Sequence, residues 1–233
     1  MKASVVVPTL NEGKVLRGML ESLYAQKTSF DFETIIVDSF STDGTLDIAR
    51  EFTDRIFNTP KGIIGLARQK GSEESEGEII VSAGADNIYD KRWMEELLLP
   101  IASGKCVASA GKLLPQDGNF LERTFSEYLL SPFSGISLAL NMPLVAGESM
   151  AFTKKAFNEI GGYNIGLVTG EDIDLIKRLR RAGKVCYCPK SVTFVSTRRI
   201  RQWGYAKYLW FHGSNFLQMH TSGKTHKEYE QVR

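Results

Sequence analysis

Several features are scarce in this sequence, and each scarcity excludes a class of protein. It contains only three cysteines, Cys106, Cys186 and Cys188, and their spacing matches no metal-binding pattern, so reduced thiols are expected. The net charge is only +2, which gives no overall field that would attract nucleic acid. No apolar run reaches the roughly 18 residues needed to cross a bilayer. The first residues lack a signal-peptide layout, because Pro8 closes a short strand. We therefore expect a cytoplasmic protein, and contact with the cytoplasmic face of a membrane stays open.

Two common nucleotide-binding signatures are also missing. No G-x-G-x-x-G follows the first expected strand, and no complete G-x-x-x-x-G-K-[ST] occurs. The segment 222–225 has the end of a phosphate-binding loop, but Gln218 occupies the position of its first glycine. A dinucleotide-dependent oxidoreductase and a phosphate-loop NTPase are both disfavoured.

What the sequence does contain is a regular alternation of strands and helices. The 42% hydrophobic and 24% charged content is that of a globular protein. Apolar periodicity predicts strands at 3–7, 33–37, 55–57 and 79–81, and helices at 14–26, 45–52 and 62–75. This alternation predicts an α/β fold with a mostly parallel central sheet flanked by helices. The second half is less regular, with helices at 91–101, 120–130, 154–160 and 170–182, strands at 106–112, 150–152, 184–188 and 193–195, an apolar loop at 131–143, and a final helix from 199 to 219.

The segment from Glu78 to Asn87 is the most informative single stretch. Its three β-favouring residues at 79–81 predict a buried parallel strand, and small residues then lead to Asp86. Ligands bind outside the carboxyl ends of such strands. One carboxylate there can hold a divalent cation that takes its other ligands from water and substrate phosphates. The alternative is that Asp86 only caps the next helix.

Four segments, read together and in order, carry a resemblance to a known family. They are Val7-Pro8-Thr9-Leu10-Asn11-Glu12, Ile36-Val37-Asp38 with the following Ser39 to Thr45, Gly84-Ala85-Asp86, and Gly170-Glu171-Asp172-Ile173-Asp174-Leu175. Over about residues 3–215 the chain resembles the family 2 glycosyltransferases, which have the GT-A fold. The resemblance implies a single domain, 1–233, with a nucleotide-sugar half at 1–87, an acceptor half at 88–220 and a polar, loosely ordered tail at 221–233.

The resemblance implies a nucleotide site around the first two strand ends. Pro8, Thr9 and Glu12 would surround the base, and Asp38 would accept the imide N–H of uracil. Arg68 falls where the family has an arginine near the nucleotide, and Gly84, Ala85 and Asp86 would line the diphosphate. The alternative for Asp38 is turn and N-cap chemistry, which is also the preferred interpretation of Asp43.

The implied metal motif departs from the family pattern. The family motif is Asp-x-Asp, and Gly84 stands in place of its first aspartate. Asp86 matches the aspartate that bears on the metal, and Mg²⁺ or Mn²⁺ would neutralise the leaving diphosphate. His212 is a candidate for a late metal ligand, although a lone histidine is more often structural.

The acidic pair Glu171-Asp172 falls in the first turn of an amphipathic helix. The resemblance implies that Asp172 is the general base that takes the proton of the acceptor hydroxyl, with Glu171 beside it. Glu148 and Glu171 are the next candidates for the base, and Glu148 is expected on the acceptor side. The alternative is a capping box from Thr169 to Asp172.

The last predicted helix is basic and aromatic. Arg198, Arg199, Arg201 and Trp203 open a segment, 196–227, that contains no acidic residue. This composition suits a lipid-phosphate site or an interfacial anchor that salt would weaken, and the alternative is that the aromatic side chains pack on the core. The overall expectation is a metal-assisted, inverting transfer of a sugar from a nucleotide-sugar, preferably UDP-linked, to an acceptor hydroxyl or lipid phosphate. A non-catalytic binder of nucleotide-sugars or anionic lipids is one alternative. A sugar nucleotidyltransferase is another, and residues 9–12 do not fit its glycine-rich first turn.

Overall fold

The computed structural model describes residues 1–223 and 225–226, and the predicted polar tail lies mostly outside them. The strands are β1 Lys2–Thr9, β2 Asp31–Asp38, β3 Ile56–Asn58, β4 Ile79–Ala83, β5 Ile88–Tyr89, β6 Ala108–Pro115, β7 Ser149–Thr153 and β8 Val185–Val195. The helices are α1 Leu16–Tyr24, α2 Thr45–Arg50, α3 Ile64–Glu74, α4 Trp93–Ala102, α5 Phe120–Phe125, the π-helical segment η1 Ser126–Leu130, α6 Ser131–Ala139, α7 Lys154–Glu159, α8 Glu171–Ala182, α9 Arg198–Trp203 and α10 Tyr205–Thr221.

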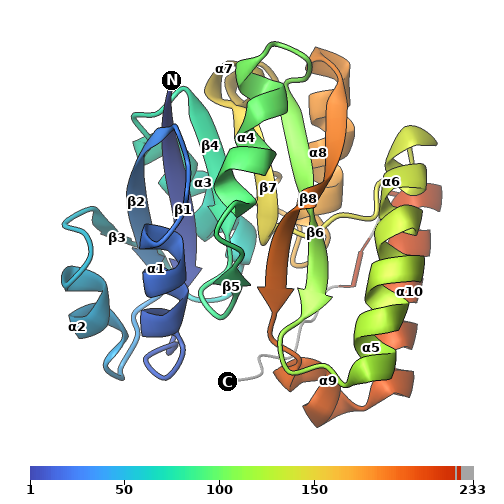
Figure 1. The fold of residues 1–233 in the computed structure, drawn as a ribbon, viewed down its shortest axis with the longest axis horizontal. Helices are drawn as coiled ribbons and strands as arrows, with labels where there is room; N and C mark the ends of the chain where they lie inside the picture. The colour runs from blue at the N-terminus through green and yellow to red at the C-terminus, as the bar shows by residue number, and fades with distance from the viewer. Residues whose placement is uncertain (224, 227–233) are drawn as a thin grey trace.

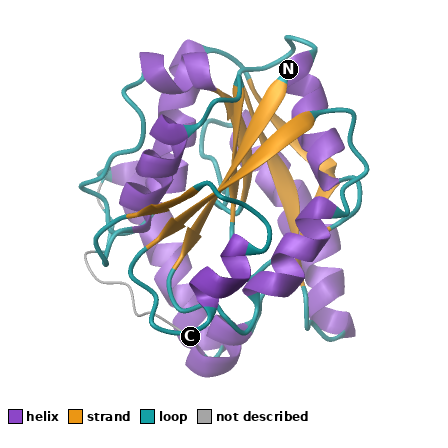
Figure 2. Ribbon diagram, turned by 90° about the vertical axis from the view of Figure 1, so that its left-hand side faces the viewer, coloured by secondary structure: helices purple, strands orange, loops and turns teal. Residues whose placement is uncertain are grey.

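One twisted sheet runs through the described part of the chain in the order β3-β2-β1-β4-β7-β6-β8-β5. Pairing is parallel from β3 to β4 and between β6 and β8, whereas β7 runs antiparallel to both β4 and β6. Figure 2 shows the strands fanning past one another with helices on both sides. The expected α/β fold is confirmed, and the antiparallel β7 accounts for the irregular second half of the sequence pattern.

Strand side chains alternate between two hydrophobic layers. Val5 and Val7 contribute to the layer packed with α1 and α4, while Val6 between them contributes to the layer packed with α3, α7 and α8. Gly71 of α3 lies directly on β1, since a Cβ there would be 2.3 Å from Cγ1 of Val6. A helix this close to the sheet needs a residue without a side chain at the contact.

Three second-half predictions were wrong. Residues 131–139 form α6 rather than a loop, because Pro132 lies in the first turn, where a helix tolerates proline. The two strands expected at 184–188 and 193–195 are one strand, β8. Its pairing with β6 shifts register where Pro189 interrupts it, so the proline sits at an irregularity. The single final helix is divided into α9 and α10 at Gly204, which has φ 77°.

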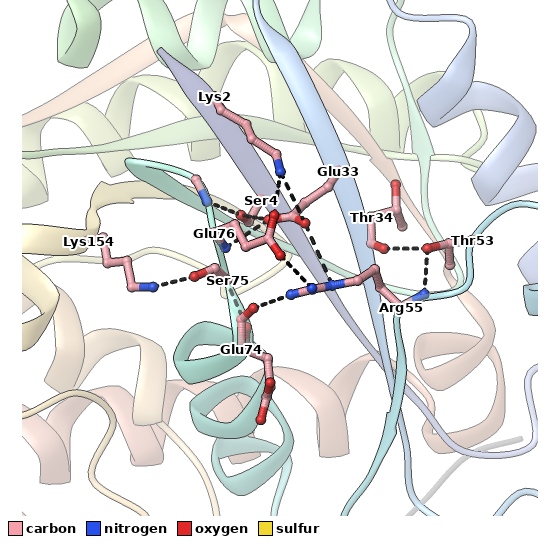
Figure 3. Close-up of polar contacts among 12 residues, drawn as sticks. Lys2, Ser4, Glu33, Thr34, Thr53, Arg55, Glu74, Ser75, Glu76 and Lys154 are labelled. Carbon is pink, nitrogen blue, oxygen red and sulfur yellow. Dashed lines mark hydrogen bonds and ion pairs between the residues drawn. The ribbon is translucent and has the colours of Figure 1, made fainter.

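The amino-terminal edge of the sheet carries a network of charged side chains (Figure 3). Lys2 Nζ lies 2.9 Å from Glu76 Oε2, and Arg55 Nη1 lies 2.7 Å from Glu76 Oε1. Glu33 approaches the same two cations at 3.4 and 3.7 Å. The network joins the beginnings of β1, β2 and β4 to the residue before β3. It lies at the edge of the sheet opposite the turns that follow Thr9 and Asp38.

Helices α5, α6 and α10 lie at the edge of the molecule farthest from β2 and β3 (Figure 1). η1 joins α5 directly to α6, so residues 120–139 form one continuous helical rod. Within the described residues, no helix is long and apolar enough to cross a membrane.

Candidate active site

The turns after β1 and β2 are bonded to each other. Asp38, at the end of β2, is fully buried, and its Oδ1 accepts a hydrogen bond from Thr9 Oγ1 at 2.9 Å. The Ser41 amide donates to Asp38 Oδ2 at 2.8 Å, and the Thr42 amide donates to Asn11 Oδ1 at 2.8 Å. Asn11 adopts φ 55°, a conformation that asparagine tolerates better than most residues. In this structure Asp38 therefore orders the turn, and a base contact would use the remaining lone pair of Oδ2.

Glu12, Asp86 and Arg198 come together from three distant segments. Arg198 Nη2 lies 2.9 Å from Glu12 Oε2 and 3.0 Å from Asp86 Oδ2. Glu12 is buried, while the Asp86 side chain is 23% exposed. The sequence suggested that Arg198 meets lipid, but here its guanidinium joins the β1 turn to the end of β4.

Gly84 is tightly packed at the position where the family motif has an aspartate. A Cβ on Gly84 would lie 2.5 Å from Asn87 Nδ2 and 3.3 Å from Glu148 Cγ. The same Asn87 Nδ2 donates to Glu148 Oε2 at 3.2 Å, and the Gly84 amide donates to the Tyr89 hydroxyl at 2.8 Å. Asn87 and Glu148 thus occupy the space that an aspartate at position 84 would need.

A buried ion pair links α3 to the start of α8. Arg68 and Glu171 are 3% and 5% exposed, and the Arg68 guanidinium donates to Glu171 Oε1. Gly147 is required beside this pair, since a Cβ there would lie 2.1 Å from Arg68 Nη1. Arg68, which was expected near the nucleotide, binds Glu171 in this structure and thereby holds the start of α8 against α3.

Asp172 is held differently from its neighbour. Its Oδ2 accepts the Gly147 amide at 2.9 Å, and its Oδ1 accepts the Ile173 amide at 2.8 Å. No capping box forms at this helix, because the N-cap is Gly170 in the left-handed conformation without a side-chain hydrogen bond. Asp172 is partly exposed, whereas Glu171 is buried.

Two carboxyls of the site, those of Glu148 and Glu171, have raised pKa values. Burial, and secondarily the Asp86 carboxylate, raise the pKa of Glu148 to about 7, and Arg68 acts in the opposite direction. Burial and the adjacent Asp172 raise the pKa of Glu171 to about 7. Both side chains therefore titrate near neutrality, as functional carboxyls often do.

Helices α9 and α10 cover this cluster with aromatic side chains. Two cations lie over the ring of Trp203, with Arg199 Cζ 5.5 Å and Lys207 Nζ 4.7 Å from its centroid. Burial raises the pKa of Tyr208, and Glu148 adds to that effect. Burial and Arg199 lower the pKa of His212 to about 4, so its imidazole is neutral at pH 7. Among the described residues, its buried Nε2 finds no hydrogen-bond partner.

These residues fit a divalent metal only if the substrate supplies most ligands. The described residues contain no group of three or more His, Cys, Asp or Glu side chains arranged to hold a metal. Asp86 and the neighbouring Glu148 are the carboxylates at hand, and Mg²⁺ is commonly held by one or two carboxylates together with substrate phosphates. His212 does not complete a protein-only metal site.

Three features of the candidate site were not anticipated from the sequence. Asn87 and Gly147 were not identified, and Arg198 was assigned to lipid. Asn87 directly follows Asp86, and Gly147 directly precedes Glu148, so adjacency to a candidate carboxylate was the available signal. Pro8 lies on β1, and Ala85 is buried in the core layer with α1 and α4.

Comparison with known proteins identifies the family. The model of glycosyl transferase family 2 matches residues 4–161. The chain belongs to this family. The match includes the turns after β1 and β2 and the Gly84–Asp86 segment, whereas Asp172, α9 and α10 lie beyond it.

Similar sequences are glycosyltransferases that are longer than this chain. The O-antigen chain rhamnosyltransferase WbaN of Salmonella anatum is 27% identical over 201 residues, covering 81% of this chain and 64% of that protein. A PGL/p-HBAD biosynthesis glycosyltransferase of Mycobacterium bovis is 29% identical over 172 residues, covering 70% of this chain and 63% of that protein. The chain thus spans a little under two thirds of these relatives.

Solved structures show the GT-A fold directly. TarS of Staphylococcus aureus in complex with UDP-GlcNAc has a TM-score of 0.67 at 21% identity, covering 85% of this chain and 59% of that chain. The mannosyltransferase PcManGT of Pyrobaculum calidifontis, in complex with GDP-Man and Mn²⁺, has a TM-score of 0.71 at 19% identity, covering 96% and 65%. The predicted GT-A fold is confirmed.

Proposed function

We propose that this protein is an inverting glycosyltransferase that moves a sugar from a nucleotide-sugar, preferably UDP-linked, to an acceptor hydroxyl or lipid phosphate. The observation that carries the proposal is the meeting of Glu12, Asp86 and Arg198 beside the carboxyl cluster of Glu148 and Asp172. It joins a cation suited to a diphosphate with carboxylates suited to proton transfer. The complexes of TarS with UDP-GlcNAc and of PcManGT with GDP-Man support a nucleotide-sugar donor.

The donor would lie across the carboxyl ends of β1, β2 and β4. In this arrangement Pro8, Thr9 and Asp38 face the nucleoside, and Asp86 and Arg198 face the diphosphate. Mg²⁺ or Mn²⁺, when bound at Asp86, would supply positive charge to the leaving group. The Mn²⁺ complex of PcManGT supports a divalent metal here.

The acceptor would approach from the side of α8 and α10. Asp172 is the proposed base because its carboxylate is partly exposed and oriented by two backbone amides, whereas Glu171 is buried against Arg68. Glu148 is the second candidate, favoured by its raised pKa of about 7. We place the protein in the cytoplasm, at the membrane face when its acceptor is lipid-linked.

A donor screen tests the proposal most directly. Thermal shift is measured with UDP-, GDP- and dTDP-sugars, with and without Mn²⁺, because a ligand that binds only the folded state raises its melting temperature. A shift with one nucleotide class, followed by release of that nucleotide in the presence of an acceptor, supports the function. Binding without turnover on soluble and lipid-linked acceptors would support a non-catalytic binder instead.

A further inference from the structure

The helical rod 120–139 and the residues just after it, 140–142, expose several large apolar side chains. Leu121 is 74% exposed, Tyr128 77%, Ile136 57% and Leu140 69%. Residues 128–147 contain no charged side chain. Isolated exposed apolar residues are ordinary, but a run of them along one rod marks a surface that contacts something.

Helix α10 extends this surface. Its Leu209, Trp210 and Leu217 are 59%, 68% and 59% exposed. The two helical segments are tied at both ends, since Arg201 just before α10 lies 2.8 Å from Glu122 of α5, and His220 Nε2 lies 3.4 Å from the Pro143 carbonyl after α6. Figure 1 shows the two running along the same edge of the molecule. We call the exposed apolar side chains of residues 120–142 and 205–217 the edge surface.

Charge around the edge surface favours an anionic partner. The acidic residues of the rod are Glu122 and Glu127, and both are paired, with Arg201 and with Lys112 at 2.8 Å. Segment 196–227 has several basic residues and no acidic one. Exposed Tyr128 and Trp210 have the amphipathic rings that favour the headgroup region of a bilayer. A neutral-to-basic apolar surface with interfacial aromatics is the chemistry of a peripheral membrane contact.

The opposite face of α10 is directed toward the carboxyl cluster of Glu148 and Asp172, the proposed catalytic cluster. Tyr208 and His212 are half-buried there, near Glu148 and Arg199. An α-helix with its side chains is only about 10–12 Å across. The edge surface and the acceptor side of the site are therefore separated by the width of one helix.

We propose that the edge surface docks on a bilayer containing anionic lipids, and that α10 thereby brings the acceptor side of the catalytic cluster to the lipid headgroups. The orientation rests on the proposed function, whereas the docking does not. Because Arg198 and Arg201 are engaged in ion pairs, the apolar side chains carry most of the attachment. Attachment of this kind resists salt better than an anchor that depends on the basic residues of 196–227.

Vesicle co-sedimentation of the whole chain tests the docking. Vesicles of phosphatidylcholine and phosphatidylglycerol, about seven parts to three, are compared with phosphatidylcholine alone. The test variant carries Ile136→Gln and Leu209→Gln, which are 57% and 59% exposed. The matched control carries Tyr24→Gln and Leu99→Gln, which are 46% and 43% exposed on α1 and α4. Thermal melts verify that both variants fold.

The unmodified protein and the control should bind the anionic vesicles, and the test variant should bind roughly ten-fold more weakly. More than half of the binding should survive about 0.5 M salt, where charge attraction is strongly screened. The proposal is overturned if the unmodified protein does not bind the anionic vesicles, or if it binds neutral vesicles equally well. It is also overturned if the test and control variants bind alike. A dimer that covers the edge surface and that the test variant dissociates would overturn it too. UDP-sugar binding measured on the same samples separates the two ideas. Donor binding without vesicle binding removes only the docking, and vesicle binding without donor binding removes only the proposed function.

Discussion

Arg198 Nη2 lies 3.0 Å from Asp86 Oδ2, although the two residues are 112 positions apart in the chain. The contact places a guanidinium at the strand end where a donor diphosphate would lie. The same nitrogen is 2.9 Å from buried Glu12, so Arg198 closes the proposed donor pocket from the side of α9. A guanidinium there can bind phosphate oxygens in a bidentate manner, which a lysine cannot do. Arg198 is thus a candidate phosphate ligand that the family match at 4–161 does not include.

Replacing Arg198 should weaken the binding of a nucleoside diphosphate more than the binding of the nucleoside alone. We expect Arg198→Ala to reduce UDP affinity roughly ten-fold or more and to leave uridine affinity unchanged, because charged hydrogen bonds are each worth about 1.5–3 kcal/mol. Calorimetry with both ligands measures the difference. Arg92→Ala is the control, since Arg92 also pairs with a glutamate at 2.9 Å but lies just before α4, as its N-cap. Equal UDP affinity in both variants would exclude Arg198 as a phosphate ligand.

Asp86 should carry the metal-dependent part of donor binding. In wild type we expect Mn²⁺ to strengthen UDP binding, and in Asp86→Ala this gain should largely disappear. The physical reason is that Asp86 is the one motif carboxylate left at the end of β4 beside Gly84. Calorimetric titrations of UDP with and without Mn²⁺ give the gain directly. An undiminished Mn²⁺ effect in the variant would remove Asp86 from the metal site.

Restoring the aspartate of the family motif should harm this protein. Gly84→Asp forces a Cβ to within 2.5 Å of Asn87 Nδ2, so Asn87 must release Glu148. We expect a loss of about 1–3 kcal/mol in the free energy of unfolding, as for other overpacked sites. Urea denaturation measures it. The double variant Gly84→Asp with Asn87→Ala should recover part of the loss, and failure to do so would show that Asn87 is not the obstacle.

The sequence predicted the N-terminal half of the fold closely because its signals are local. Apolar runs such as Ile79 to Val81 alternate with amphipathic helices, and each element is defined by its own periodicity. The C-terminal half was harder because its elements depend on tertiary context. The helix expected at 120–130 is present, but residues 131–139 keep several apolar side chains outside, and their proline and glycine content indicated a loop. Strand β8 tolerates Pro189 only because its pairing with β6 is irregular there.

The sequence motifs marked several candidate site residues by their type, but they did not predict which residues these would contact. Asp86, Glu171 and Asp172 stand in short motifs next to strand ends or helix starts, where sequence alone marks them. The contacts of Arg198 with Glu12 and Asp86, and the pairing of Arg68 with Glu171 across 103 positions, arise from the fold. No pattern in the neighbourhood of either arginine predicts its partner.

The raised pKa of Glu148 predicts how stability depends on pH. Between about pH 4.5 and pH 7 the folded protein keeps a proton that the unfolded chain has lost, so stability should fall as pH rises through this range. Glu148→Gln should reduce the fall and stabilise the protein by about 2 kcal/mol at about pH 8.5. Urea denaturation at several pH values measures the slope, with exposed Glu159→Gln as the control. The pKa of Glu171 is raised as well, so Glu171 also lowers stability as pH rises. Part of the pH dependence should therefore remain in Glu148→Gln. A slope identical to wild type in Glu148→Gln would show that this carboxyl titrates normally.

Variants of Asp172 and Glu171 should differ in effect: replacing Asp172 should slow sugar transfer, and replacing Glu171 should lower stability. Asp172→Asn keeps an oxygen that can accept the Gly147 amide, but it loses the basicity needed to take a proton. We expect unchanged donor affinity, a melting temperature close to wild type and transfer slowed about 10²–10⁴-fold. Glu171→Ala instead removes the oxygen to which the buried Arg68 guanidinium donates, so it should lose about 3 kcal/mol of stability, measured by urea denaturation. Single-turnover transfer with saturating donor gives the rate for each variant. If Asp172→Asn transfers at the wild-type rate, the base is elsewhere, and the same assay on Glu148→Gln tests the next candidate.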